Sequence, residues 1–169
     1  MADKYIRQNA GQLAEVEGTV TSAGAGDSGK IVALDSSGKL DNSMMPSGIG
    51  ADTEVMASSE NLAAGDLVNI WNDSGTRKAR KADASNGRRA HGFVISSVTS
   101  PANATVYLSG DITGLTSLTP GTAYYLSGTT AGASTSTSPS TAGQISQEIG
   151  IAVSTTAIAF QPQQPITLA

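Results

Sequence analysis

Residues 24–30 contain the side chains and spacing that come nearest to a ligand-binding motif. Gly24, Gly29 and Lys30 match the glycines and the lysine of G-x-x-x-x-G-K-[ST], a loop whose backbone amides hold phosphate while the lysine reaches the terminal oxygens. The last position is Ile31, which has no hydroxyl to bind Mg²⁺. The following residues predict a short strand and a turn, whereas a phosphate loop requires a helix there. The pattern therefore disfavours nucleotide binding.

A second pattern, Gly26-Asp27-Ser28-Gly29, is similar to the nucleophile segment of chymotrypsin-like proteases. In those enzymes the catalytic histidine precedes the serine, whereas His91, the single histidine of this chain, follows it. With no second histidine and no cysteine to share a metal ion, we interpret His91 as an ordinary exposed residue at the end of a strand. We therefore expect no enzymatic activity, no cofactor and no metal.

Basic residues are concentrated in one stretch that could neutralise phosphate groups. The nearest aromatic residues, Trp71 and Phe93, do not alternate with the basic residues as stacking platforms for nucleic-acid bases do. The net charge of the whole chain is −4. We expect a solvated hairpin face or an interface with an acidic partner, and no nucleic-acid binding. The basic residues are Arg77, Lys78, Arg80, Lys81, Arg88 and Arg89.

The elements that must position these residues come from a weakly charged chain. Of its 169 residues, 14% are charged, about half the usual share, and 38% are hydrophobic, so the core is small. Aromatic residues make up 4%, and we take Trp71, Tyr124 and Tyr125 as candidates for the core or an oligomer interface. No apolar run has the length of a signal peptide or a membrane span, so we expect cytosolic synthesis and no membrane contact.

Residues 51–169 predict a compact β domain. Short β-type runs are separated by regularly spaced turn signals, as in an all-β sandwich or a β-barrel. Residues 129–140 consist almost wholly of Ser, Thr, Ala and Gly, which predicts a flexible or exposed tip. Two runs alternate with period two, and we expect their apolar members to face the core: Val106 and Leu108 in one, Ile149, Ile151 and Val153 in the other.

Residues 1–50 predict an extended attachment arm and a linker. Residues 12–17 would suit a helical turn, and residues 44–50 read as the linker. Residues 30–34 and 39–41 predict two strands joined by a turn at 35–38. Such a hairpin is marginally stable alone, and we expect the arm to become ordered on a partner. Its apolar contact residues are Tyr5, Ile6, Ile31, Val32, Leu34, Leu40, Met44 and Met45.

The same arm carries a resemblance to a known group of proteins. Residues 29–46 are similar to a G-K-[IV]-V-x-L-[DN]-x-x-G-K-[IL]-D-x-S-[ML]-[ML]-P segment found near the N-termini of tailed-bacteriophage virion proteins. These proteins are described as capsid decoration (cement) proteins, head fibres or tail-fibre components. The downstream stretches that resemble the same group are residues 62–70, 92–94, 104–110, 118–127 and 150–154.

The resemblance implies a non-enzymatic protein that decorates and stabilises the capsid exterior of a phage. It would be made in the bacterial cytoplasm and would dock onto the major capsid protein through its N-terminal arm. The resemblance also implies a homotrimer that projects its β domain from the capsid surface. The alternative is a short tail-fibre or baseplate adhesin that binds a host-surface glycan. A nucleotide-binding enzyme is the third hypothesis, which a Lys30→Ala substitution would test.

Overall fold

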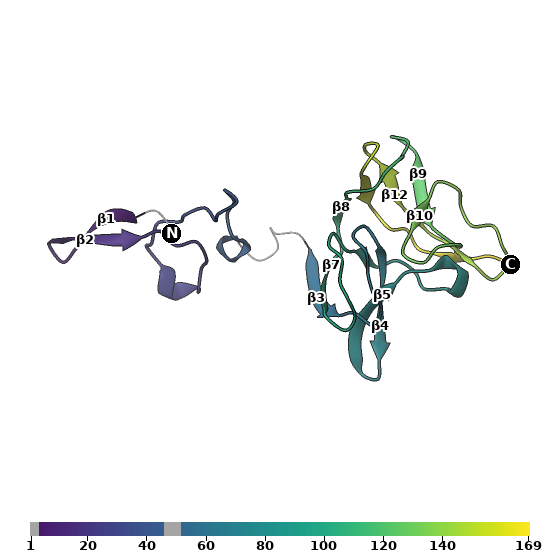
Figure 1. Cartoon of the computed structure of the whole chain (residues 1–169), viewed down its shortest axis with the longest axis horizontal. Helices are drawn as coiled ribbons and strands as arrows, with labels where there is room; N and C mark the ends of the chain where they lie inside the picture. Colours follow the sequence, from purple (N-terminus) through teal and green to yellow (C-terminus); the bar gives the residue numbers. More distant parts are fainter. Residues whose placement is uncertain (1–3, 46–51) are drawn as a thin grey trace. The chain divides into compact units, whose positions relative to one another are not determined.

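The computed structural model describes residues 4–45 and 52–169, and the chain divides into two compact units, Met1–Gly50 and Ala51–Ala169 (Figure 1). The described residues confirm an all-β protein, whose strands form several antiparallel sheets. Among these residues the helices are three short 3₁₀ turns, and none of the sheets closes into a barrel.

The N-terminal unit contains one hairpin, formed by β1 (Lys4–Asn9) and β2 (Gln12–Glu17). Its turn is made by Ala10 and Gly11, with φ angles of 50° and 85°. The tightest hairpin turns need positive φ at both central residues, which glycine adopts without strain. Residues 12–17 are therefore a strand, and the helical turn predicted there is wrong.

The predicted hairpin at residues 30–41 is also wrong, although its turn is present. The Asp35 carboxylate accepts hydrogen bonds from the backbone N–H groups of Ser37 and Lys39, at 2.8 and 2.9 Å. Within the described part of the chain, the residues on either side of this turn do not pair with each other as strands. Val32 forms a β-bridge with Thr19 instead. The Thr19 N–H donates to the Ile31 carbonyl, and Ala33 N–H donates to the Thr19 carbonyl, both at 2.9 Å.

Two 3₁₀ turns, η1 (Ala25–Asp27) and η2 (Asn42–Met44), complete the N-terminal unit. No residue of 4–45 whose side-chain burial the structure describes is buried. The predicted linker at residues 44–50 lies largely outside the described residues. The described part of the N-terminal unit therefore has hydrogen bonds but no hydrophobic core.

The first sheet of the C-terminal unit surrounds a core of small and medium apolar side chains. Its two outer strands approach each other, because the Ser59 N–H donates to the Ala79 carbonyl at 2.8 Å. The strand order is β3 (Thr53–Ala57), β7 (Asn103–Tyr107), β6 (Gly92–Phe93), β4 (Leu67–Asp73) and β5 (Thr76–Lys81). The core residues are Met56, Leu62, Val68, Ala79, Val94, Ala104 and Val106.

A second sheet packs against the first sheet, on the face opposite the core described above. The side chains between the two sheets form a second core. Phe93 of β6 stacks on Tyr107 and meets Phe160 edge-on, with ring centroids 5.5 and 5.3 Å apart. The strand order is β10 (Ser134–Thr135), β9 (Ala123–Leu126), β12 (Glu148–Ala152), β13 (Ile158–Phe160) and β8 (Gly110–Ile112). A small sheet of β11 (Ile145–Ser146) and β14 (Ile166–Thr167) and the 3₁₀ turn η3 (Ala84–Asn86) complete the unit.

The predicted core stripe of β12 is only partly correct. Ile149 is fully buried, but Ile151 and Val153 are exposed and Ala152 is buried instead. The pairing of β12 with β9 is irregular between Glu148 and Gly150, and Gly150 has a φ of 145°. A bulge adds one residue to a strand and so exchanges the faces of the residues that follow. The other predicted stripe is confirmed for Val106, which is buried, while Leu108 packs at the margin of the core.

Residues 129–140 are part of the domain, and the prediction of an exposed tip is wrong for most of them. β10 pairs with β9, and Gly132 is buried. The Gly132 N–H donates to the Ala82 carbonyl, and the Leu67 N–H donates to the Gly132 carbonyl, both at 2.7 Å. Small side chains allow this backbone to lie close against neighbouring strands, which composition alone does not reveal.

Candidate partner-binding site

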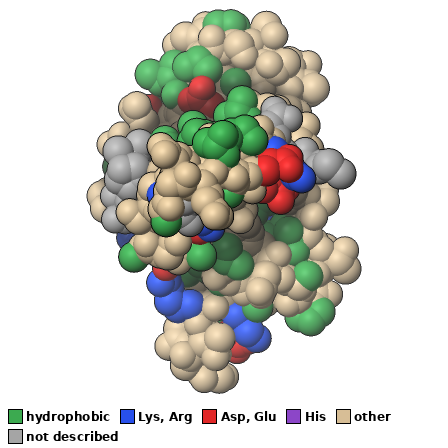
Figure 2. All heavy atoms as spheres, turned by 90° about the vertical axis from the view of Figure 1, so that its left-hand side faces the viewer, with side chains coloured by type: hydrophobic (Ala, Val, Ile, Leu, Met, Phe, Trp, Pro, Cys, Tyr) green, Lys and Arg blue, Asp and Glu red, His purple; other side chains and the backbone are tan. Residues whose placement is uncertain are grey.

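Apolar side chains at the surface of the N-terminal unit are the main candidate for a partner-binding site (Figure 2). The most exposed of the predicted contact residues are Ile6, at 65%, and Leu34, at 57%. Tyr5 and Met44 are half-buried. Leu13, exposed at 78%, was not among the predicted residues. The other exposed members of the predicted set are Ile31, Val32, Leu40 and Met45.

The backbone of the N-terminal unit determines where these side chains project. In the hairpin register, Ile6 pairs with Glu15 and Leu13 pairs with Gln8, which places Ile6 and Leu13 on one face. Tyr5 lies on the opposite face, where its hydroxyl accepts a 3.3 Å hydrogen bond from the Ile31 N–H. Tyr5 therefore links the hairpin to the segment that carries Ile31.

In the segment that partly matches a phosphate loop, the Asp27 carboxylate binds the groups that would otherwise be available to a phosphate. Asp27 accepts a 2.6 Å hydrogen bond from the Ala23 N–H, and its other oxygen is paired with Lys30 Nζ at 2.6 Å. These hydrogen bonds, that of Lys30 first, lower the pKa of Asp27. The lysine that a phosphate would need is thus paired within the loop.

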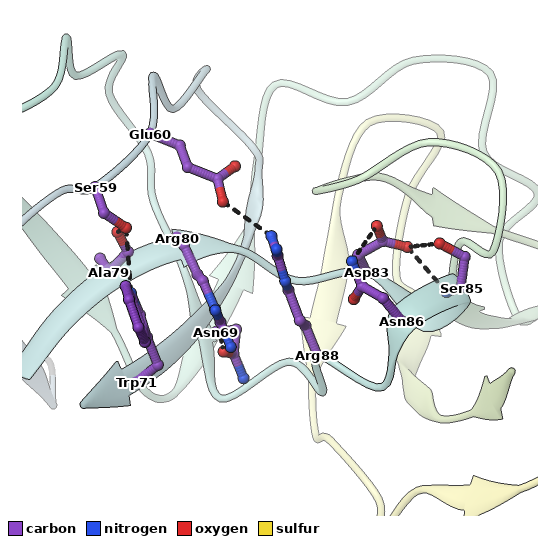
Figure 3. Close-up of polar contacts among 10 residues, drawn as sticks. All are labelled: Ser59, Glu60, Asn69, Trp71, Ala79, Arg80, Asp83, Ser85, Asn86 and Arg88. Atoms are coloured by element: carbon purple, nitrogen blue, oxygen red, sulfur yellow. Dashed lines mark hydrogen bonds and ion pairs between the residues drawn. The ribbon is translucent and has the colours of Figure 1, made fainter. Parts of the chain in front are cut away.

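Most of the basic cluster is neutralised by neighbouring carboxylates in the C-terminal unit. Arg88 contacts Glu60 at 3.0 Å, as Figure 3 shows. Ion pairs at the surface contribute little stability, and these are at least partly exposed, but they cancel local positive charge. The remaining pairs are Arg77 with Glu54, Lys78 with Asp73, and Lys81 with Asp66.

Arg80 contacts neutral side chains and has no ion pair with a carboxylate among the described residues. Its guanidinium carbon lies 4.5 Å from the centre of the Trp71 ring, a cation–π contact, and its Nε donates to Asn69 Oδ1 at 2.9 Å (Figure 3). Burial, followed by the positive charge of Arg88, lowers the pKa of Arg80. Carboxylates or the Trp71 ring and Asn69 thus satisfy the basic side chains of the cluster, with the exception of Arg89.

The three aromatic residues predicted for the core or an oligomer interface lie in two different sheets. Trp71 lies in β4, while Tyr124 and Tyr125 lie in β9 of the other sheet. Tyr124 is a core residue, exposed by 6%, and its hydroxyl accepts a 3.1 Å hydrogen bond from the Thr119 N–H. Trp71 and Tyr125 are half-buried and keep surface for a contact.

His91 and Gln147 lie together where the two sheets meet, and sequence reasoning did not predict the role of Gln147. His91 is half-buried, so the prediction of an exposed histidine is wrong, and the Ile70 N–H donates to its Nδ1 at 2.9 Å. Burial, with a smaller effect from the positive charge of Arg89, lowers the pKa of His91. Gln147 is 2% exposed and bonds both backbone polar groups of Ala90. A lone glutamine between two strands gives no sequence signal for such a role.

The described residues contain no group of three or more His, Cys, Asp or Glu side chains placed to hold a metal ion. Within residues 4–45 and 52–169, no helix has the length and apolar character needed to cross a membrane. No protein-family model, curated protein or solved structure matches the chain.

Proposed function

We propose that the protein is a structural component of a tailed-phage virion that docks on the capsid exterior through its N-terminal unit. The observation that carries the proposal is that no residue of 4–45 whose burial the structure describes is buried, together with the exposure of apolar side chains such as Ile6, Ile31 and Leu34. A unit that buries nothing gains little free energy from folding alone. Contact with a partner would supply the missing burial.

The resemblance of residues 29–46 to virion proteins supports the capsid as that partner. In this proposal the C-terminal unit is a β-sandwich-like domain that projects from the shell as part of a homotrimer. Three arms that each make a modest contact would bind with far greater avidity than one arm. Binding to assembled subunits, and not to free ones, would stabilise the capsid by mass action.

The test is binding of the purified protein to expanded, empty capsids. We expect the full chain to bind in stoichiometric amounts, and a chain lacking residues 1–46 to remain folded but not to bind. Circular dichroism and thermal unfolding would verify the fold of the truncated chain. Capsid binding that is unaffected by the deletion would disprove docking through the arm.

Point substitutions locate the contact more closely. Ile31→Ser and Leu34→Ser remove exposed apolar side chains of the arm, and each should weaken capsid binding by about tenfold, the loss expected for about 1.4 kcal/mol. Val55→Ser is the matched control, because Val55 is at least as exposed as Ile31 and Leu34 but lies in the C-terminal unit. A similar loss of capsid binding in the control would indicate that the contact is not made specifically by the arm.

A second candidate, the host-binding adhesin, is favoured by a cleft in the C-terminal unit. The cleft has a volume of about 530 Å³ and is lined mainly by hydroxyl and small side chains, including Thr116, Ser117, Ser134 and Thr135. Asp66 and Tyr124 add further hydrogen-bonding groups. Apart from the Asp66 carboxylate, which is paired with Lys81, these polar groups are neutral, and such groups suit a saccharide. The adhesin predicts binding to host cells by the C-terminal unit alone, whereas a capsid protein should show none.

A further inference from the structure

A second, smaller cleft lies beside His91, at the edge where the two sheets meet. Its volume is about 230 Å³, and its polar lining consists of Arg89, His91, Gln147, Gln163 and Gln164. Clefts for drug-sized ligands measure about 300–1,000 Å³. This cleft therefore has room for a small organic molecule or a single sugar ring.

Arg89 gives the cleft a positive charge that the described residues do not cancel. Its side chain is exposed, and its one hydrogen-bond contact within residues 4–45 and 52–169 runs from Nε to His91 Nε2, at 2.8 Å. The basic residues of the same cluster that pair with carboxylates are Arg77, Lys78, Lys81 and Arg88. Arg89 thus retains donors that no carboxylate in the described chain accepts.

The hydrogen bonds of His91 leave one donor without an acceptor. The Ile70 N–H approaches Nδ1 at 2.9 Å, and the Arg89 Nε–H approaches Nε2 at 2.8 Å. A neutral imidazole carries a proton on one nitrogen, so it cannot accept at both. The Ile70 N–H is a fixed backbone donor, and we therefore place the lone pair at Nδ1 and the proton at Nε2. The Nε2–H and the Arg89 Nε–H then face each other.

We propose that the cleft binds a carboxylate of a small organic molecule, whose oxygens accept from the His91 Nε2–H and the Arg89 guanidinium. A carboxylate is acceptor-only and matches the planar guanidinium with two parallel hydrogen bonds. The exposed Arg89 side chain is free to move outward and admit it. The side-chain amide of the exposed Gln164 is placed at the same cleft for further hydrogen bonds.

The experiment is a nuclear magnetic resonance titration of the full chain, followed at the imidazole of His91. Because the chain has one histidine, this signal needs no assignment. The probes are acetate, glucuronate and glucose, added at constant ionic strength. We expect saturable shifts with the two carboxylates, with dissociation constants of about 1 mM, and none with glucose. Tighter binding of glucuronate would indicate an acidic sugar as the ligand, and equal binding would indicate a small free carboxylate.

Arg89→Gln should weaken carboxylate binding by about tenfold or more, because it removes the bidentate donor. Arg77→Gln, which removes one positive charge from an exposed arginine elsewhere in the same unit, should leave the affinity within about twofold. The exposure of Arg89 makes loss of folding unexpected, and thermal unfolding would verify this. The proposal is overturned by carboxylates that give no saturable shift, by unchanged affinity in Arg89→Gln, or by equal losses in both variants.

Discussion

Gln147 joins the two halves of the C-terminal unit through one buried amide. Its Oε1 accepts from the Ala90 N–H at 2.7 Å, and its Nε2 donates to the carbonyls of Ala90 and Gln163, at 3.0 and 3.1 Å. Ala90 precedes β6 of the first sheet, whereas Gln147 lies between β11 and β12. A buried polar group with all its partners in place favours a single packing of the sheets.

Gln147→Leu should therefore destabilise the domain by about 2–6 kcal/mol. The substitution keeps a similar volume but leaves the buried N–H and C=O of Ala90 without partners, at about 1–3 kcal/mol each. Gln164→Leu is the control, because Gln164 is exposed, and it should cost less than about 0.5 kcal/mol. Urea unfolding of both variants measures the difference, and equal costs would contradict the role given to Gln147.

The lowered pKa of His91 makes stability depend on pH. Burial and Arg89 depress this pKa below 6.5 in the folded state, so the unfolded state binds the proton more readily. The contribution of His91 to stability is full above about pH 6.5 and is lost as the pH falls through the lower, folded pKa. We expect the wild type to lose stability between pH 7.5 and pH 5.5 in urea unfolding, and His91→Gln to lose less. An identical loss in both proteins would contradict this.

At the scale of elements, the bulge in β12 decides which apolar residues reach the core. Gly150 has a φ of 145°, and a Cβ there would lie 1.9 Å from the Ala159 carbonyl oxygen. Gly150→Ala should therefore cost more than about 3 kcal/mol or prevent folding. Gly75→Ala is the matched control, since Gly75 also has positive φ, 91°, but open space around it, and should cost about 1 kcal/mol. Thermal unfolding compares them, and similar costs would show that the close approach is unimportant.

The hairpin β1–β2 and the segment after it should open easily in the free protein. Their hydrogen bonds are formed, but no described residue in 4–45 is buried, and exposed elements open at small free-energy cost. We expect their amides to exchange with deuterium at least about a hundredfold faster than those of β4 and β12. Added capsids should slow exchange in the N-terminal unit. Equal protection of both units in the free protein would contradict the proposed attachment arm.

For the whole molecule, the proposed trimer makes a quantitative prediction. Sedimentation equilibrium should give a particle of three times the chain mass of 17.0 kDa. Variants that remain monomeric should dissociate from capsids at least about a hundredfold faster, because simultaneous binding of three arms is lost. A monomeric wild type that binds capsids as tightly would contradict docking by avidity.

Several features were predictable because they depend on neighbouring residues alone. Short β-type runs between turn residues predicted an all-β protein, and the turn at residues 35–38 was correct because the Asp35 side chain bonds its own following backbone. The burial of Val106 followed from simple alternation. The pairing of Ile31 and Ala33 with Thr19 was not predictable, because it depends on residues distant in the chain that compete for the same backbone groups.

By itself, the sequence determined the all-β class and the apolar character of the N-terminal arm, since both are sums over local residue types. The tertiary structure decided which apolar residues are hidden: a bulge at Gly150 turns Ile151 and Val153 outward, although their spacing is that of a core strand. It also decided the environment of Lys30, which forms an ion pair with Asp27. Arg89 contacts His91 and has no carboxylate partner among the described residues. Distances of a few ångströms control hydrogen bonding and charge, and residue order does not contain them.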